Sequence, residues 1–337
     1  MLKVALLDDY AGVALQSADW SELDGIAEIT VFNAHLSEQE AIAALKPFHV
    51  LCTIRERMAM PRTLFENLPR LKLVTIIGKE LANLDMKAAT DHGVVVIHPD
   101  SDRRGRPDVS NATPELCWGL IIAAVRHIAH EERRMRAGLW QDTAGMILHG
   151  RTLGLLGLGR IGKRMAHYAQ AFGMNVIAWS QNLTDEAAEA VGVRRVGKDE
   201  LFALSDVLSI HVRLSDRTRN MVTARELGLM KPSAYLVNTS RGPIVDEDAL
   251  ISALRDGRIA GAGLDVYDVE PLPADHVLRD MENVTLLPHL GYSTRDTLAA
   301  FYGDMPEAIA AYARGRPVRV INSEALSHPR QAGLASQ

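Results

Sequence analysis

The sequence contains only two cysteines, Cys52 and Cys117, among its 337 residues. Both lie in apolar stretches, and isolated cysteines in such stretches are typically buried, reduced thiols. The N-terminus also lacks the signature of an export signal, because Asp8 and Asp9 stand where a signal peptide would still be apolar. The sequence therefore predicts a protein without a disulfide framework that works in the reducing cytoplasm.

Long apolar runs and strong net charge are lacking as well. The longest uncharged apolar run covers residues 116–125 and is too short to cross a bilayer, so it predicts a buried helix. The net charge is only −5, whereas a general nucleic-acid binder would need a basic face. We therefore expect neither a membrane nor a nucleic acid as a partner, and we assign no residues to a metal site.

What the sequence does contain is a long alternation of short β-like runs and helical patterns. Runs rich in Val, Ile and Leu predict strands at 3–7, 49–54, 73–77 and 94–97 and, in a second series, at 151–156, 175–179, 207–211, 235–238, 261–266 and 284–287. Helical patterns predict helices at 37–45, 113–138, 163–172 and 294–313. Such an alternation is typical of parallel sheets covered by helices on both faces.

The length of the chain and its 47% content of apolar residues predict two domains, because one ordinary core would be too small. The first strand series ends near residue 100, so residues 1–100 form the first domain. The second series places another domain at 101–290. We expect the remaining segment, 291–337, to return to the first domain. The predicted fold class is α/β, with two doubly wound parallel-sheet domains.

Residues 153–162 contain a glycine motif of the form G-x-G-x-x-G, made by Gly157, Gly159 and Gly162. A predicted strand precedes the motif and a predicted helix follows it. In this context the first glycine makes a tight turn, the second lets the backbone approach a pyrophosphate, and the third lets the helix pack closely on the strand. The motif therefore predicts a dinucleotide site at the N-terminus of the helix, where free N–H groups favour phosphate.

The acidic residue that normally follows such a motif by about 20 positions is missing. The next strand ends at Ser180, Gln181 and Asn182. Asp185 comes too late, inside the following helical pattern. Ser180 and Asn182 can bond either a ribose hydroxyl or a ribose phosphate. We therefore expect NAD as the cofactor, with weak discrimination against NADP.

Three polar residues, Arg241, Glu270 and His289, each come shortly after a predicted strand of the second series. The carboxyl ends of parallel strands meet at one edge of the sheet, where ligands bind. Reduction of a keto acid needs a cation for the carboxylate, a proton donor that works near neutral pH, and a carboxylate that orients the donor. Arginine, histidine and glutamate fit these three roles. The sequence therefore predicts hydride transfer between a nicotinamide cofactor and a small acid.

These segments together resemble the D-isomer-specific 2-hydroxyacid dehydrogenases. The resemblance covers nearly the whole chain and is carried by segments at 157–162, 230–242, 263–272, 288–292 and 315–322. It implies a Rossmann cofactor domain and a flavodoxin-like substrate domain that close on the substrate. It also implies a small 2-hydroxy or 2-keto acid as the substrate and a homodimer built around the cofactor domains.

The resemblance further implies a role for each matching residue. Arg241 would bind the substrate, Glu270 would support the histidine, and His289 would be the acid and base. Asp265 would hold the carboxamide of the nicotinamide. The remaining cofactor contacts implied are Arg160, Ile161, His211 and Thr239.

The chain departs from the family pattern around its substrate loop, at residues 77–83. Gly78 would hold the substrate carboxylate through its backbone. Lys79 is either a solvated side chain or an extra cation for a second acidic group, and Arg55 is a further candidate contact. Residues 99–115 form a longer segment than usual with three arginines, either a solvated loop or a basic flap over the substrate.

Two other functions remain open at this stage. A non-catalytic corepressor that senses a dinucleotide can have the same fold and retain all three polar residues. An enzyme of the same family can instead oxidise phosphite or formate, although formate enzymes typically have Gln where Glu270 stands. No long disordered interaction tail is visible in the sequence, which favours the enzyme that acts on hydroxy and keto acids.

Overall fold

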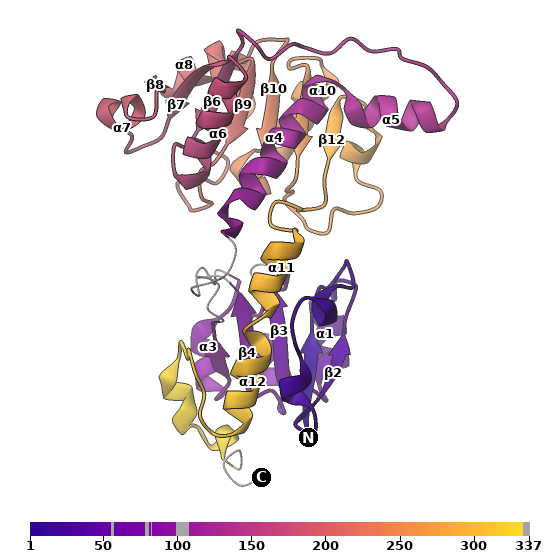
Figure 1. Cartoon of the computed structure of the whole chain (residues 1–337), viewed down its shortest axis with the longest axis vertical. Helices are drawn as coiled ribbons and strands as arrows, with labels where there is room; N and C mark the ends of the chain where they lie inside the picture. Colours follow the sequence, from indigo (N-terminus) through magenta and orange to yellow (C-terminus); the bar gives the residue numbers. More distant parts are fainter. Residues whose placement is uncertain (55–56, 78–80, 82, 99–107, 333–337) are drawn as a thin grey trace. The chain divides into compact units, whose positions relative to one another are not determined.

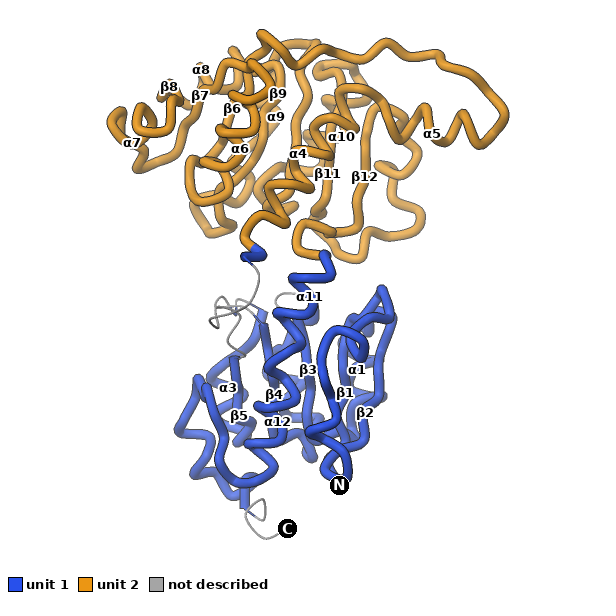
Figure 2. Tube along the Cα trace, viewed as in Figure 1, with its two compact units in different colours: residues 1–109, 294–337 blue, residues 110–293 orange. Residues whose placement is uncertain are grey.

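The structure, a computed structural model, describes residues 1–54, 57–77, 81, 83–98 and 108–332. The chain divides into two compact units, coloured separately in Figure 2: unit 1 comprises Met1–Val109 and Thr294–Gln337, and unit 2 comprises Ser110–Ser293. The sequence placed the domain boundaries near residues 100 and 290. No helix among the described residues is both long enough and apolar enough to cross a membrane.

Unit 1 contains a parallel sheet with the strand order β2-β1-β3-β4-β5 (Figure 1). Its strands are β1 (Leu2–Leu6), β2 (Ala27–Val31), β3 (Val50–Ile54), β4 (Leu73–Ile77) and β5 (Val95–Ile97). Its helices include α1 (Glu38–Leu45), α2 (Arg62–Asn67), α3 (Met86–Asp91), α11 (Arg295–Tyr302) and α12 (Met305–Ala313). β3 and β4 are buried along their whole length, as expected for strands covered on both faces.

The edge strand β2 was not predicted from the sequence. Its five residues, Ala27–Val31, are alternately half-buried and exposed, so they form no continuous apolar run. The strand exists because each of these residues pairs in parallel register with a residue of β1. Such pairing is a long-range contact that a local hydrophobic pattern does not reveal.

Unit 2 contains a second parallel sheet, with the order β12-β11-β10-β9-β6-β7-β8. Its strands are β6 (Thr152–Leu156), β7 (Asn175–Trp179), β8 (Arg194–Arg195), β9 (Val207–Ile210), β10 (Tyr235–Asn238), β11 (Gly261–Leu264) and β12 (Val284–Leu286). Its helices include α4 (Ala112–Val125), α5 (Ile128–Arg136), α6 (Arg160–Ala171), α7 (Asp185–Glu189), α8 (Lys198–Leu204), α9 (Ala224–Leu229) and α10 (Glu247–Arg255). The two parallel sheets with their helices confirm the predicted fold class.

The core of unit 2 lies on both faces of this sheet. Leu155 of β6 packs in a cluster with side chains of α4 and α6, whereas Leu156, the next residue, packs with side chains of α8, α9 and α10. Leu156 and Leu264 are linked in register through the intervening strands β9 and β10. The segments that follow these strands therefore leave the sheet at one common edge.

The single helix predicted at 113–138 is wrong, because two helices occupy this segment. α4 ends at Val125, and His127 adopts a left-handed conformation with φ of 53° before α5 begins. The carbonyl oxygen of Val125 accepts the N–H of Met146 at 2.8 Å. A Cβ on Gly145 would lie 2.7 Å from that oxygen, so only glycine allows this approach. The segment at Met146, which is distant in sequence, thus occupies a carbonyl oxygen at the end of α4 that a continued helix would use.

The single helix predicted at 294–313 is wrong for a more local reason. α11 ends at Tyr302, and α12 begins at Met305 after the N-cap Asp304. Pro306 stands in the first turn of α12, where its missing N–H costs no intrahelical hydrogen bond. The proline therefore marks the start of a second helix.

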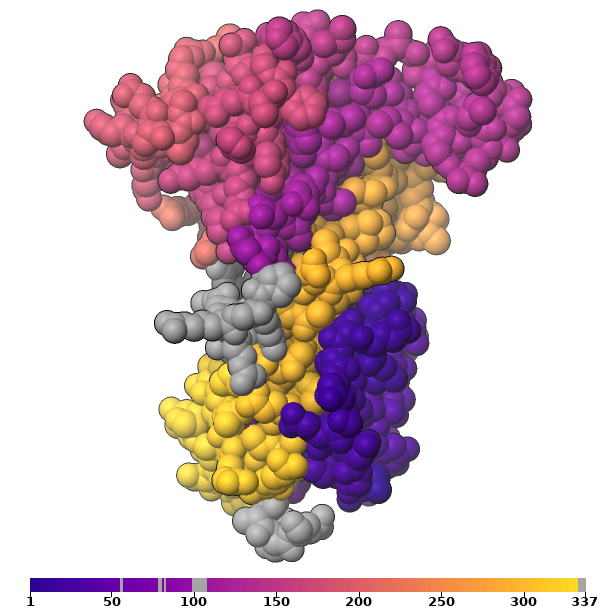
Figure 3. All heavy atoms as spheres, viewed as in Figure 1, coloured from indigo at the N-terminus to yellow at the C-terminus, as the bar shows by residue number. Residues whose placement is uncertain are grey.

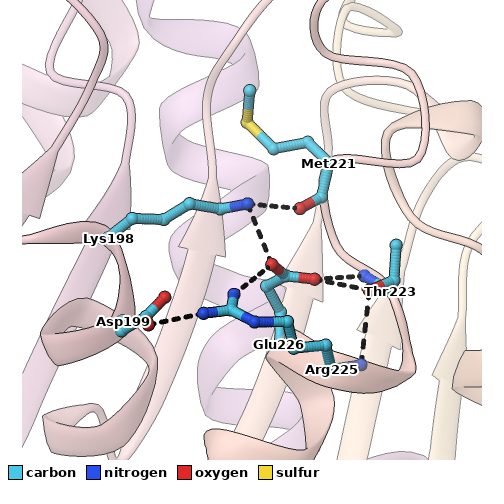
Figure 4. Close-up of polar contacts among 6 residues, drawn as sticks. All are labelled: Lys198, Asp199, Met221, Thr223, Arg225 and Glu226. Atoms are coloured by element: carbon cyan, nitrogen blue, oxygen red, sulfur yellow. Dashed lines mark hydrogen bonds and ion pairs between the residues drawn. The ribbon is translucent and has the colours of Figure 1, made fainter.

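α8 and α9 of unit 2 are joined by a polar network (Figure 4). Thr223 and Glu226 form a capping box at the start of α9, with Thr223 N–H donating to Glu226 Oε2 at 3.0 Å. Lys198, the first residue of α8, donates to Glu226 Oε1 at 3.0 Å. Arg225 donates to the same oxygen at 2.8 Å. The buried carboxylate of Glu226 thereby fixes the first turns of both helices.

Candidate active site

The glycine turn lies between the end of β6 and the start of α6. Gly157 has a φ of 107°, a conformation that residues with a side chain rarely adopt. A Cβ on Gly162 would lie 2.2 Å from the carbonyl oxygen of Gly157, so α6 can approach the turn this closely only with glycine. A Cβ on Gly159 would meet nothing within 4 Å. The backbone at Gly159 is therefore open to a ligand.

The start of α6 fits a bound dinucleotide. Gly159 is the N-cap residue, and no side chain among the described residues caps the helix, so its first N–H groups can bind a phosphate. Arg160 is exposed at the first helical position, and Ile161 beside it is half-buried. The open backbone and the uncapped N–H groups are what a pyrophosphate requires. The residues present thus fit NAD.

His211 and Thr239 follow β9 and β10 at the same sheet edge. His211 Nε2 lies 2.9 Å from the hydroxyl of Ser209, and burial lowers the pKa of the His211 imidazole to about 3. The ring is therefore neutral at physiological pH. A Cβ on Gly157 would lie 2.9 Å from the His211 carbonyl carbon, so the two loops are in close contact. Thr239 is buried at the end of β10.

Ser180 and Asn182 lie in the turn after β7. Ser180 is half-buried, and its carbonyl oxygen accepts the N–H of Leu183 at 3.1 Å, whereas Asn182 is exposed. Asp185, the next acid along the chain, forms an ion pair with Arg195 at 3.3 Å. The carboxylate of Asp185 is thus already engaged by a cation, and the turn itself offers only neutral polar side chains.

His289 and Glu270 form a direct hydrogen-bonded pair. His289 Nδ1 lies 2.6 Å from Glu270 Oε2, and Glu270 Oε1 accepts the N–H of Tyr267 at 3.0 Å. Burial alone would raise the pKa of Glu270, but the hydrogen bond and charge of His289, the N–H of Tyr267 and the charge of Arg241 outweigh burial and lower this pKa. Glu270 is therefore ionised at neutral pH and orients the imidazole.

Arg241 belongs to the same electrostatic centre, because its charge contributes to the lowered pKa of Glu270. The side-chain amide of Asn238 donates to the Arg241 carbonyl oxygen at 2.9 Å and so fixes the loop after β10. A Cβ on Gly242 would lie 2.0 Å from the carbonyl carbon of Tyr267. Glycine at this position therefore lets the loop of Arg241 pack directly against the loop that leads to Glu270.

Asp265 is fully buried at the end of β11 and holds the turn that carries His289. Its Oδ1 accepts the N–H of Leu290 at 2.7 Å, and its Oδ2 accepts the N–H of Gly291 at 2.9 Å. His289 itself has a φ of 54°, and these two bonds hold the chain next to that left-handed residue. Burial is the main reason that the pKa of Asp265 is raised. Both oxygens of Asp265 thus serve the His289 turn.

The predicted site residues of unit 2 form two groups along one sheet edge. Arg241, Glu270 and His289 follow β10, β11 and β12, whereas Ser180 and Asn182 follow β7 on the far side of the glycine turn. β7 lies three strands from β10, roughly 14 Å at the usual strand spacing. This separation suits an elongated dinucleotide, with its adenosine ribose at β7 and its nicotinamide at β10.

Three predicted substrate contacts, Arg55, Gly78 and Lys79, lie outside the described residues, as do the arginines of segment 99–107. Sequence reasoning also missed two residues that the structure places at the site. Asn238 could have been found, because it is a polar residue that ends an apolar strand directly before the arginine segment. Tyr267 contributes its backbone N–H, for which the sequence contains no signal.

Comparisons with known proteins show the family to which this chain is similar. The family model described as D-isomer specific 2-hydroxyacid dehydrogenase, NAD binding domain, matches residues 118–291, and the model of the catalytic domain of the same family matches residues 4–131. A glyoxylate reductase of Aeropyrum pernix is 38% identical over 80% of this chain and 82% of its own length. A D-3-phosphoglycerate dehydrogenase of Methanocaldococcus jannaschii is 35% identical over 87% of this chain and 55% of its own length.

A solved structure is also similar to this chain over nearly its whole length. The phosphoglycerate oxidoreductase from Vibrio cholerae o395 has a TM-score of 0.86 and 37% identity, and the match covers 94% of this chain and 100% of the other. All three relatives carry the names of enzymes, and none of them favours the non-catalytic alternative. The chain therefore belongs to the D-isomer-specific 2-hydroxyacid dehydrogenases, NAD-dependent enzymes that transfer a hydride to or from 2-hydroxy and 2-keto acids.

Proposed function

We propose that this protein interconverts a small 2-keto acid and the corresponding D-2-hydroxy acid, with Arg241, Glu270 and His289 as its catalytic residues. The observation that carries this proposal is the 2.6 Å contact between His289 Nδ1 and Glu270 Oε2. An ionised carboxylate at that distance fixes the orientation of the imidazole ring and its tautomer. A positioned imidazole of this kind can act as both acid and base.

The side chains divide the reaction between them. Bound NADH would supply the hydride to C2 of the substrate in the reducing direction, and bound NAD⁺ would accept it from C2 in the oxidising direction. In the reducing direction a C–H bond forms at C2, the carbonyl double bond opens, and its oxygen takes a proton from His289. Because Nδ1 of His289 faces Glu270, Nε2 is the atom assigned to this proton. The planar guanidinium of Arg241 pairs with the substrate carboxylate and polarises the carbonyl group.

The other cofactor and substrate contacts predicted from the sequence also belong to this proposal. Gly157, Gly159, Arg160, Ile161 and Gly162 would hold the pyrophosphate, and the other cofactor contacts would be Ser180, Asn182, His211, Thr239 and Asp265. Substrate contacts would come from unit 1, through Arg55, Gly78 and Lys79.

The turn after β7 supports weak discrimination between NAD and NADP. Ser180 and Asn182 carry no charge that would repel a ribose phosphate, and Asp185 is paired with Arg195. Steady-state kinetics with both cofactors test this proposal. We expect values of kcat/KM that differ by less than about a thousandfold, or about 4 kcal/mol. A larger preference for either cofactor would contradict it.

The substrate class is tested by a panel of keto acids, assayed through the loss of reduced-cofactor absorbance. The names of the relatives point to glyoxylate and to phosphorylated or hydroxylated three-carbon acids as the first compounds to compare. We expect turnover with small keto acids and much less with branched ones. An enzyme that turned over none of them with either cofactor would contradict the proposed function.

We further propose a cytoplasmic homodimer that binds no nucleic acid. The two buried, free thiols suit a reducing compartment, and a net charge of −5 does not favour binding to a polyanion. Support for the dimer comes from unit 2, where Met135, Trp140 and Ile147 are 60%, 72% and 73% exposed. Figure 3 shows α5 and the segment after it extending away from the rest of this unit. Large apolar side chains of this kind are typical of an interface with a second copy.

A further inference from the structure

Three polar side chains of unit 2 form a line from the apolar core to the sheet edge that carries the glycine turn. Cys117 of α4 places its Sγ 3.4 Å from the Oγ of Ser209 in β9, and this oxygen lies 2.9 Å from Nε2 of His211. Cys117 and Ser209 are completely buried, whereas His211, which follows β9, is half-buried. We call these three residues the Cys117 string.

Burial determines the protonation state at both ends of the Cys117 string. It raises the pKa of the Cys117 thiol, so the sulfur keeps its proton at neutral pH. It lowers the pKa of the His211 imidazole to about 3, so the ring is neutral. A neutral imidazole has one nitrogen that donates a hydrogen bond and one that accepts it. The string therefore has one proton to place at each of its three residues.

The direction of the hydrogen bonds follows from the strengths of the acceptors. The unprotonated nitrogen of an imidazole accepts a hydrogen bond readily, whereas a thiol sulfur is a weak acceptor. The single proton of the Ser209 hydroxyl therefore points to His211 Nε2 rather than to Cys117 Sγ. The oxygen of Ser209 then accepts the thiol proton of Cys117. In this arrangement His211 carries its own proton on Nδ1.

The outer end of the Cys117 string packs against the glycine turn. A Cβ on Gly157 would lie 2.9 Å from the carbonyl carbon of His211, and a Cβ on Gly162 would lie 3.9 Å from the His211 Cβ. His211 thus contacts the first and the third glycine of the motif. Its Nδ1 makes no hydrogen bond to a residue that the structure describes. An N–H group without a partner in the protein can donate to a ligand at this edge.

We propose that Ser209 and Cys117 are positioning residues for the dinucleotide. They hold His211 as the tautomer with its proton on Nδ1, and this N–H donates to an oxygen of bound NAD. The inference rests on the proposed cofactor contact of His211, and it adds the donor atom and the two residues that fix it. Because Ser209 and Cys117 are completely buried, they act on NAD only through His211.

The first test is a fluorescence titration of the Ser209→Ala variant with NADH. Without the hydroxyl, both neutral tautomers of His211 become accessible and the ring loses its fixed orientation. We expect the Kd for NADH to rise by about tenfold, the effect of one lost hydrogen bond. At saturating NADH, kcat with the best keto acid should stay within about twofold of wild type, whereas a general distortion of the unit would lower it.

The possible results separate this inference from the proposed function. An unchanged Kd in Ser209→Ala, or a fall in kcat without a change in Kd, would overturn the positioning role. A wild-type enzyme that bound no NADH would instead overturn the proposed function.

The second test compares two substitutions of the thiol. Cys117→Ala removes the donor to Ser209, and we expect the Kd for NADH to rise by about threefold. Cys117→Ser keeps a donor of similar size and should restore the wild-type Kd. The matched control is Cys52→Ala, which removes the other buried thiol, in unit 1, and should leave the Kd unchanged. Equal Kd values for Cys117→Ala and Cys117→Ser would refute the role of the thiol.

The third test needs no substitution within the buried part of the string. Nitrogen NMR of wild-type enzyme labelled with ¹⁵N-histidine distinguishes the two neutral tautomers, and His211→Asn identifies the signal of His211. We expect a neutral ring at pH 7 with its proton on Nδ1 and an unprotonated Nε2. A proton on Nε2, or a charged ring, would contradict the inference even if Ser209→Ala did not fold.

Discussion

At the scale of single residues, the proposed active site depends on two carboxylates with different tasks. Glu270 has a lowered pKa and bonds His289 Nδ1 directly, whereas Asp265 has a raised pKa and bonds the backbone on the far side of the histidine. The first orients the ring, and the second fixes the turn from which the ring projects. The resemblance to known enzymes implied a carboxamide contact for Asp265, and that contact stays a prediction.

The Asp265→Asn variant tests whether Asp265 acts mainly by fixing the His289 turn or mainly by binding the carboxamide of the nicotinamide. Asn offers one acceptor oxygen where Asp265 offers two, and its amide would face the N–H of Leu290 or of Gly291. The turn of His289 should shift, so we expect kcat to fall by about tenfold or more, a larger factor than the loss of NAD affinity that follows from the proposed carboxamide contact. Steady-state kinetics and NAD titration measure the two quantities. Asp275→Asn, an exposed position in the same unit, is the matched control.

The opposite split in Asp265→Asn would carry a different meaning. A loss of NAD affinity with kcat retained would assign Asp265 to the carboxamide and leave the His289 turn to other contacts.

The types of the proposed catalytic residues could be predicted from the sequence because arginine, glutamate and histidine follow successive strands. The atoms that they use could not, since Nδ1 of His289 and the N–H of Tyr267 meet Glu270 only in the folded chain.

At the scale of elements, most strands could be predicted because both sheets are parallel and buried. A continuous apolar run such as Leu73–Ile77 is typical of such strands. The failures occur where a contact from elsewhere in the chain decides the outcome. β2 forms by pairing with β1, and α4 ends where Met146 bonds the carbonyl of Val125. Neither contact leaves a local pattern in the sequence.

The α8–α9 network gives a prediction about stability at this scale. The side chain of Glu226 is 6% exposed. Burial would raise its pKa, but hydrogen bonds from Thr223 and Lys198 outweigh burial and lower the pKa to about 2. Glu226→Gln should lower the free energy of unfolding at pH 7 by about 2 kcal/mol, as expected for hydrogen bonds to a buried charge. Urea unfolding of both proteins measures the difference.

The pH dependence of that difference has a definite sign. Because the folded pKa of Glu226 lies below its unfolded value of about 4.5, its contribution is fully present above pH 4.5 and is lost as the pH falls toward 2. The gap between wild type and variant should therefore shrink over this range. Glu200→Gln, which removes an exposed ion pair with Arg194, should change stability very little at any pH. A constant gap for Glu226→Gln would contradict the account.

At the scale of the whole molecule, we expect a homodimer that forms through unit 2. Trp140→Asp places a charge among the exposed apolar side chains near α5, so we expect it to shift the protein from dimer to monomer. Sedimentation velocity measures the state of assembly at micromolar concentration. Leu15→Asp changes a half-exposed leucine of unit 1 and should leave the dimer intact. A wild-type monomer, or a Trp140→Asp dimer, would refute this interface.

The central claim is that a proton moves through His289, and the His289→Gln variant tests it most directly. Turnover should be measured with the best keto acid of the panel, and the affinity for NADH by fluorescence titration of the same preparation. We predict a loss of turnover of about a hundredfold or more with NADH affinity retained, while His167→Gln on the exposed side of α6 behaves as wild type. Native turnover in His289→Gln would contradict the mechanism.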